Sequence, residues 1–129
     1  MNKLISFLIG IVTILFSSLV FAGGHSKAMY IHIINFNITG INRSEYEAAA
    51  MELTSAFAEV PGLKRKHWLA NEENNTYGGV YIFDSKESHD AFTESELYAG
   101  VKGNPSFTNF SGKSFENIDS LAKHTRGTE

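Results

Sequence analysis

The chain has 129 residues, with 11 Lys and Arg against 14 Asp and Glu, a formal net charge of −3, and no Cys. This balance excludes the strongly basic surface that nucleic-acid binding requires, so no nucleic acid is expected among its partners. The lack of Cys excludes disulfides, thiol nucleophiles and thiolate metal sites.

The first 22 residues have the pattern of a secretory signal peptide. Lys3 supplies a positive start, Leu4–Val20 is an uncharged apolar run of about 17 residues, and Val20–Ala22 places small residues at a cleavage site. A retained membrane anchor is the alternative, but the run is short for a spanning helix. We therefore predict a signal peptide over 1–22, one mature domain over 23–129, and a secreted or periplasmic bacterial protein with no stable membrane anchor.

The mature chain begins with a predicted strand and helix. The Ile-rich run over 29–38 is typical of a largely buried strand. Apolar residues then recur at helical spacing from Tyr46 to Val60, and Asn42 with Glu45 resembles a capping box at the start of this helix. Pro61 disfavours helical backbone before it, so the helix is expected to end by Val60.

Pro61–Phe83 has the pattern of a β-hairpin, with strands at 63–71 and 77–83 joined by a polar turn. Asp84 and Glu87 suggest the N-cap of a second helix near 85–94, followed by a short helical turn at 97–101. A last strand over 107–115 and a short helix at 118–121 complete the chain. Strict alternation in that strand groups Phe107, Asn109 and Ser111 against Thr108, Phe110 and Gly112.

The order β-α-β-β-α-β predicts a ferredoxin-like α+β fold, with a four-stranded antiparallel sheet and both helices on one face. The other face of the sheet would carry many apolar side chains, and leaving them in water would be costly. The same face of a second copy is the simplest cover, so we predict a homodimer.

The residues of the hairpin and of the segment after it carry a family resemblance. Pro61–Leu63, Lys66, Trp68 and the Gly78–Asp84 run, followed by the segment to Pro105, resemble the YdhR-type monooxygenases of the dimeric α+β barrel superfamily. These proteins are similar to the antibiotic-biosynthesis monooxygenases. The resemblance spans 29 to about 119, and the secretory leader departs from it.

The resemblance implies a dimeric α+β barrel with a pocket inside each subunit, between sheet and helices. It also implies an oxidoreductase of the monooxygenase class, which acts on phenolic, polyketide-like compounds without metal or flavin. In such enzymes the deprotonated substrate reacts with oxygen, while the protein positions it and stabilises an anion. The pocket residues of the family include an Asn, a Trp and a Tyr. Trp68 and Tyr81 match by their place in the hairpin, and Asn35 or Asn37 is a possible partner.

The residues themselves give a candidate site. Lys66 and Trp68 are two apart on one strand and share a face, so Lys66 could stabilise an enolate or phenolate while Trp68 stacks on a ring. His67 lies beside Trp68 and is the preferred general base. The site is therefore predicted to contain Trp68, Tyr81 and His67 as catalytic candidates, with Lys66, Asn35, Trp68 and Tyr81 binding the substrate. The competing interpretation is that Trp68 packs in the core or at the dimer interface and that Lys66 extends into solvent.

The other histidines, among them His32 and His89, are interpreted as surface or hydrogen-bonded groups. No pair has the spacing of metal ligands, so neither a metal nor another cofactor is predicted. Two classes of function remain open: a cofactor-independent monooxygenase for a small aromatic or enolisable compound, and a non-catalytic dimeric binder of a small apolar ligand. Haem binding or degradation is a weaker alternative, because Phe83 occupies the place where haem-degrading relatives have Trp. Polar groups converging inside the pocket would favour chemistry.

Overall fold

The computed structural model describes residues 28–128, so the predicted signal peptide lies outside the described residues. The elements follow the predicted order. They are β1 (Tyr30–Ile38), α2 (Arg43–Ala58), β2 (Leu63–Asn71), β3 (Thr76–Phe83), α3 (Lys86–Thr93), α4 (Glu96–Lys102), β4 (Phe107–Glu116), α5 (Asp119–Ala122) and a 3-10 turn, η1 (Lys123–Thr125). Within the part of the chain that the structure describes, no helix is both long and apolar enough to cross a bilayer.

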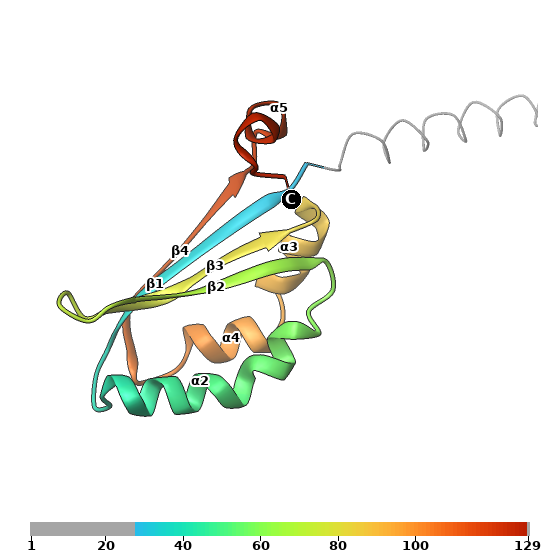
Figure 1. Ribbon diagram of the computed structural model, residues 1–129. Helices are drawn as coiled ribbons and strands as arrows, with labels where there is room; N and C mark the ends of the chain where they lie inside the picture. The colour runs from blue at the N-terminus through green and yellow to red at the C-terminus, as the bar shows by residue number, and fades with distance from the viewer. Residues whose placement is uncertain (1–27, 129) are drawn as a thin grey trace, which may run out of the picture.

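The four strands form one antiparallel sheet in the order β2-β3-β1-β4, and α2 and α4 lie on the same side of it (Figure 1). This is the ferredoxin-like α+β fold that the sequence predicts. Strand β1 alternates its buried side chains, so His32, Ile34 and Phe36 face the helices. They pack with Tyr81 and Phe83 of β3 to form the centre of the core.

Helix α2 begins at the predicted capping box. The Asn42 side chain accepts a hydrogen bond from the Glu45 backbone amide at 2.9 Å, and the Asn42 amide donates to the Glu45 carboxylate at 3.0 Å. Tyr46 and Phe57, near the two ends of the helix, are its buried side chains. Ala49 and Leu53, predicted as part of the same apolar stripe, remain exposed because the middle of the helix stands over a hollow rather than on the sheet.

The second helix starts one residue later than the sequence suggests. Ser85, rather than Asp84, is the N-cap of α3 and accepts a hydrogen bond from the Ser88 amide. The Asp84 carboxylate instead accepts hydrogen bonds from the hydroxyls of Ser85 and Ser88, at 3.1 and 2.7 Å. The polar side chains after β3 therefore still begin the helix, with their roles redistributed.

Strand β4 does not follow strict alternation. Asn109 has a φ of 54°, and the pairing with β1 shifts register between Asn35 and Asn37. Such a bulge adds one residue to a strand and reverses the side-chain pattern beyond it. Phe107 and Phe110 consequently both pack against the core, where alternation had placed them on opposite faces. Ser114 also turns toward the helices, where it contacts two histidines.

Candidate functional site

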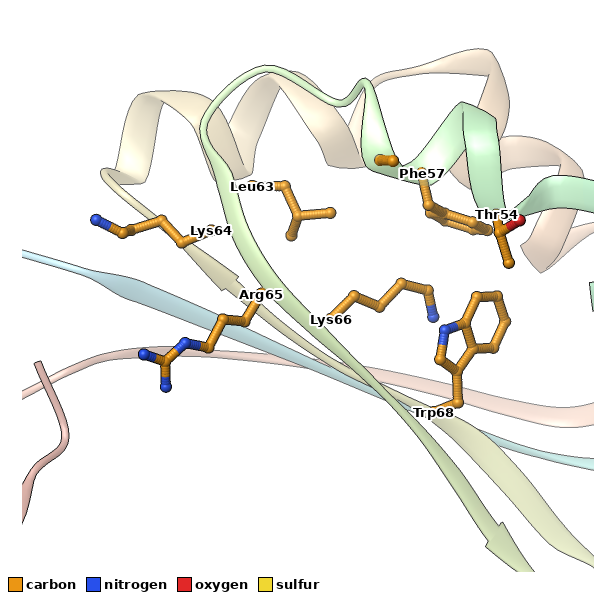
Figure 2. Close-up of a pocket in the computed structure, with 8 residues that line it drawn as sticks. Thr54, Phe57, Leu63, Lys64, Arg65, Lys66 and Trp68 are labelled. Atoms are coloured by element: carbon orange, nitrogen blue, oxygen red, sulfur yellow. The ribbon is translucent and has the colours of Figure 1, made fainter. Parts of the chain in front are cut away.

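A lysine amine and three aromatic rings meet between α2 and the edge of the sheet. The Nζ atom of Lys66 lies 3.4 Å from the centre of the Trp68 ring, 4.3 Å from that of Tyr81 and 4.7 Å from that of Phe57. In Figure 2 the Lys66 side chain points toward Trp68 and Phe57, whereas Arg65 points to the other side of the strand. We call Lys66, Trp68, Tyr81 and Phe57 the lysine pocket.

Strand pairing explains why these side chains converge. Lys66 pairs with Tyr81, and Trp68 pairs with Gly79, so one face of the β2–β3 hairpin carries both contacts. Gly79 leaves the space that the amine occupies, because a Cβ at this position would lie 2.8 Å from Lys66 Nζ. Phe57 comes from the end of α2 and covers the group on the side of the helix, with its ring perpendicular to that of Trp68.

Two hollows adjoin the lysine pocket. An outer hollow of about 240 Å³ opens between α2 and β2, and an inner one of about 60 Å³ lies under the middle of α2. Both are lined by Phe57, Lys66 and Trp68, which therefore stand between them. The inner hollow is largely apolar, with these residues along its lining: Phe36, Tyr46, Ala49, Ala50, Leu53, Gly78, Tyr81, Val101, Asn104 and Phe107.

The amine of Lys66 is held without a counter-charge. Among residues 28–128, no carboxylate forms an ion pair with it. Burial lowers the pKa of Lys66 to about 7, because a charged amine loses solvation between the rings. Contact with ring faces favours the ammonium by about 0.5 to 2 kcal/mol, and this offsets part of the lowering of the Lys66 pKa. Both forms of the amine are therefore available near neutral pH.

The phenols of Tyr81 and Tyr46, which line the inner hollow, stay protonated. Burial is the main cause that raises the pKa of Tyr81 well above its usual value, and it raises that of Tyr46 to about 12. A protonated phenol can donate a hydrogen bond but does not neutralise an ammonium. The pocket thus offers one basic group, in largely apolar surroundings, beside aromatic faces on which a planar molecule could stack.

A second polar group is buried further along the sheet. His32 of β1 and His89 of α3 are only 3 % and 6 % exposed. The Nδ1 atom of His32 lies 3.1 Å from His89 Nε2 and 3.0 Å from Ser114 Oγ, which in turn lies 2.8 Å from His89 Nε2. Tyr98 and Asp90 bind the remaining ring nitrogens, at 3.1 and 2.9 Å. We call these five residues the histidine chain.

One consistent set of donors satisfies the histidine chain. A carboxylate only accepts, so His89 Nδ1 donates to Asp90, and its Nε2 can accept from the Ser114 hydroxyl. His32 Nδ1 can then donate to Ser114, while its Nε2 accepts from Tyr98. Burial, and secondarily the neighbouring His89, lowers the pKa of His32 to about 4. The His32 ring is therefore neutral at physiological pH and its hydrogen bonds are complete.

Neither region is a metal cluster. Within residues 28–128, no group of three or more His, Asp or Glu side chains is placed to hold a metal ion. The histidine chain contributes two imidazoles, two hydroxyls and one carboxylate, and the lysine pocket contributes a single amine and one phenol.

The family described as "Putative mono-oxygenase ydhR" matches residues 31–128, which cover every strand except the first residue of β1. The chain belongs to this family. Among curated proteins, none is similar enough to the chain to count as a relative.

Solved structures share the fold of this ydhR family member at low sequence identity. SnoaB, a cofactor-independent oxygenase from Streptomyces nogalater, is 14 % identical with a TM-score of 0.57, covering 70 % of this chain and 93 % of SnoaB. The "putative antibiotic biosynthesis monooxygenase" of Caulobacter crescentus is 13 % identical with a TM-score of 0.58, covering 71 % and 92 %. MhuD, crystallised with two manganese protoporphyrin IX molecules per active site, is 22 % identical with a TM-score of 0.56, covering 69 % and 94 %. At these identities the likeness shows the fold alone.

The structure brings together three of the predicted site residues and separates two. Lys66, Trp68 and Tyr81 meet in the lysine pocket. His67 pairs with Val80 and lies, by alternation, on the opposite face of the sheet, where it is exposed. Asn35 lies on that same open face, between the inward-facing Ile34 and Phe36. Adjacency in sequence to Trp68 favoured His67, but neighbours along a strand point to opposite sides.

The alternative amide, Asn37, has a structural role in this ydhR family member. Its side chain donates to the Asn75 carbonyl at 2.7 Å and accepts from Asn109 at 2.7 Å, which ties the hairpin turn to the bulge of β4. Asn104, which the sequence did not single out, instead lines the inner hollow.

Sequence reasoning also missed Phe57, the third ring of the lysine pocket, and the histidine chain. Phe57 was expected as part of the apolar stripe of the helix, and nothing in its spacing marks it as a neighbour of Lys66. A signal for His32 does exist, because it alternates with Ile34 and Phe36 in an Ile-rich strand and so shares their buried face. The link to His89 depends on the packing of α3 against β1, which the sequence does not reveal.

Proposed function

We propose that this protein is a cofactor-independent monooxygenase that acts on a small aromatic or enolisable compound in the lysine pocket. Membership of the ydhR family supports the monooxygenase-like activity. The observation that carries the finer proposal is the convergence of Lys66, Trp68 and Tyr81 on one partly enclosed spot. A purely structural pocket gains nothing from an amine with a depressed pKa and no ion-pair partner.

The pocket supplies what such a reaction needs from the protein. A ring of the substrate stacks on Trp68 in the outer hollow, with its acidic C–H or O–H group toward the amine. Neutral Lys66 accepts that proton, and the resulting ammonium stabilises the enolate or phenolate. The anion then reduces oxygen. For a CH₂ group, uptake of O₂ gives a carbonyl and one water, so the substrate supplies all the electrons.

The size of the hollows limits the substrate to one or two rings. The outer space of about 240 Å³ is near the lower limit of ligand pockets, and the inner one of about 60 Å³ admits a small substituent. A porphyrin is far larger than either space. Phe83, which replaces the Trp of haem-degrading relatives, is fully buried in the core and is absent from the lining of both hollows. The haem alternative is therefore the weakest of the three.

Oxygen consumption with one-ring and two-ring substrates, such as benzoquinols, naphthoquinols and tetralones, tests the activity. Replacing Lys66 by Met should lower kcat/KM by about 10²-fold or more, because it removes the proton acceptor. Trp68→Ala should raise KM more than it changes kcat, because stacking binds the substrate before and during the reaction. Lys113→Met, the same change at an exposed lysine of β4 that lines neither hollow, is the matched control and should leave both constants unchanged.

The alternative class, a non-catalytic binder of a small apolar ligand, makes a different prediction in the same assay. A binder would quench Trp68 fluorescence with the same compounds but would consume no oxygen above the spontaneous rate. Binding without turnover across the panel would replace the enzymatic proposal with this alternative.

We also propose that the protein is a homodimer through the open face of its sheet. Ile31 pairs with Ile82 on one side and Phe115 on the other, so an apolar row crosses three strands on the face away from the helices. Phe115 is 47 % exposed. Covering such a row with a second copy removes apolar surface from water.

Light scattering of the purified protein tests the dimer. A mass of two chains at micromolar concentration is expected, and Ile82→Asp should shift it to one chain because a carboxylate would be buried at the interface. A wild-type protein that stays monomeric under these conditions would contradict the proposal.

Export to the bacterial envelope is a further proposal that rests on the sequence. Expression of the full chain in a bacterial host should yield a periplasmic protein whose first residue is Gly23, as determined by intact mass. A protein that keeps residues 1–22 and sediments with membranes would favour the anchor instead.

A further inference from the structure

We infer that Lys66 is a covalent site for carbonyl compounds, where its amine forms an imine with an aldehyde or ketone bound in the outer hollow. The inference deepens the proposed function, on whose pocket it rests, by narrowing the substrate class to molecules that carry a carbonyl group next to an aromatic ring.

The position of the amine is the first argument. Lys66 lines both hollows, so its amine lies beside a space of about 240 Å³ that opens between α2 and β2. Trp68 and Phe57 line the same outer space. The amine covers one face of Trp68 at 3.4 Å, so a ligand ring that packs against Trp68 displaces the flexible lysine toward the outer hollow and brings an attached carbonyl carbon close to the amine, as attack requires.

The surroundings of the amine are the second argument. The residues of α2 that line the outer hollow, Thr54, Phe57 and Ala58, carry no charge. From β3, Tyr81 faces the amine with a phenol that burial keeps protonated. On β2 itself the neighbouring charges, Lys64 and Arg65, are both positive. Among residues 28–128 no carboxylate pairs with the amine, and the ring faces that favour its charged form act against burial, which lowers its pKa to about 7.

The chemistry balances without a further reactant. The lone pair of the neutral amine attacks the carbonyl carbon, and the carbinolamine loses one water to give the C=N bond. Nothing is oxidised or reduced in this step. The protonated imine then withdraws electrons from the adjacent carbon, so a C–H bond there becomes more acidic than in the parent carbonyl compound. Covalent attachment would thus prepare an enolisable compound for deprotonation, and water in the outer hollow accepts the proton, because the Lys66 nitrogen is then held in the imine.

Reductive trapping under argon tests the inference. The purified protein is treated briefly at pH 7 with phenylacetaldehyde and sodium cyanoborohydride, and labelled lysines are located by peptide mass spectrometry. Lys66 should be labelled at least about tenfold faster than the exposed Lys113 of β4, which lines neither hollow, because burial lowers the pKa of the Lys66 amine and the outer hollow holds the aldehyde beside it. Its labelling rate should level off above about pH 8. Equal labelling of Lys66 and Lys113 would overturn the inference.

Two variants separate this result from the oxygenase proposal. Lys66→Arg keeps the charge and cannot form the imine, so the preferential label should vanish while circular dichroism shows an unchanged fold. Lys113→Arg, away from both hollows, should leave the Lys66 label intact. Because the trapping excludes oxygen, a specific label without oxygen consumption would support the covalent site and refute oxygenation, whereas consumption without any label would do the reverse.

Discussion

The lysine pocket and the histidine chain lie in the same layer between sheet and helices, yet they are built in opposite ways. Every ring nitrogen of His32 and His89 has a hydrogen-bond partner. The amine of Lys66 faces three ring planes and no carboxylate of the described chain, beside a Trp68 side chain that is 42 % exposed. Burial lowers the pKa of both His32 and Lys66, but His32 has hydrogen-bond partners and Lys66 has only ring faces.

The contrast separates a structural use of burial from a chemical one. A fully connected polar group stabilises one arrangement of the core and loses energy if a member is removed. An amine without a partner costs stability and is retained where its reactivity is needed. The two regions should therefore respond in opposite directions when each is replaced by an apolar residue.

The largest expected effect comes from removing one member of each region. His32→Ala should lower the free energy of unfolding by about 2 to 4 kcal/mol, because it leaves a cavity among Tyr81, Phe92 and Tyr98 and removes hydrogen bonds from Ser114 and Tyr98. Lys66→Met should cost less than about 1 kcal/mol or stabilise the fold, since a flexible apolar chain fits among rings. Urea denaturation measures both. Equal losses would show that Lys66 is structural.

Two glycines provide a smaller, matched test. A Cβ at Gly112 would lie 2.7 Å from Tyr98 OH and 3.2 Å from His32 Nε2, inside a connected network. A Cβ at Gly79 would lie 2.8 Å from Lys66 Nζ, at the free end of a flexible side chain, and 3.1 and 3.2 Å from Tyr81 Cε1 and the His67 carbonyl oxygen. Gly112→Ala should therefore cost about 1 to 3 kcal/mol in urea denaturation, and Gly79→Ala less, because the shortest contact at Gly79 can relax by a movement of the lysine.

The functional effect of the two glycine variants should be reversed. Gly79→Ala moves the amine away from the rings, so it should slow the trapping of Lys66, whereas Gly112→Ala should not. Loss of trapping in both variants would mean that the two regions are mechanically coupled.

The two regions should change the stability of the protein in different pH ranges. The folded-state pKa is depressed for both bases, so the unfolded chain binds more protons and stability rises with pH between the folded and unfolded values. For His32 the window runs from about 4 to 6.5, and for Lys66 it runs from about 7 to 10.5. Each contributes a slope of at most about 1.4 kcal/mol per pH unit.

Single variants should remove one window at a time in urea denaturation across pH. His32→Asn should flatten the acidic window and leave the alkaline one, and Lys66→Met should do the opposite. If Lys66→Met leaves the alkaline slope unchanged, the burial of its amine is not the cause of that slope.

Within the histidine chain, the smallest effect is expected at Ser114. Ser114→Ala removes the hydroxyl between the two histidines, but His32 Nδ1 can still donate directly to His89 Nε2 across 3.1 Å. The cost should be about 0.5 to 1.5 kcal/mol by thermal or urea unfolding. A loss of several kcal/mol would show that the hydroxyl, rather than the histidine pair, holds the chain together.

The sequence predicted most of the fold because its signals were local. The capping box at Asn42, the Pro61 break and the alternation of β1 each depend on neighbouring residues, and the structure contains all three. The bulge at Asn109 escaped because Asn permits left-handed backbone without requiring it, and the pairing with β1 decides where the bulge occurs.

The candidate site was predicted in part for the same reason. Alternation correctly grouped Lys66 with Trp68, and hairpin pairing added Tyr81. It could not tell which face of the hairpin meets the helices, so His67 and Asn35 were included although they lie on the open face. Phe57 reaches the pocket through the packing of α2, a tertiary contact with no local signature.

The way α2 packs on the sheet has a consequence for how ligand preference can evolve by substitution. Its anchors, Tyr46 and Phe57, are near its ends, and the residues above the inner hollow are Ala49, Ala50 and Leu53. Enlarging or shrinking these three side chains would alter the capacity of the hollow without disturbing either anchor. Ligand preference could therefore diverge among homologues through a few substitutions on one helical turn, while the fold and the lysine remained the same.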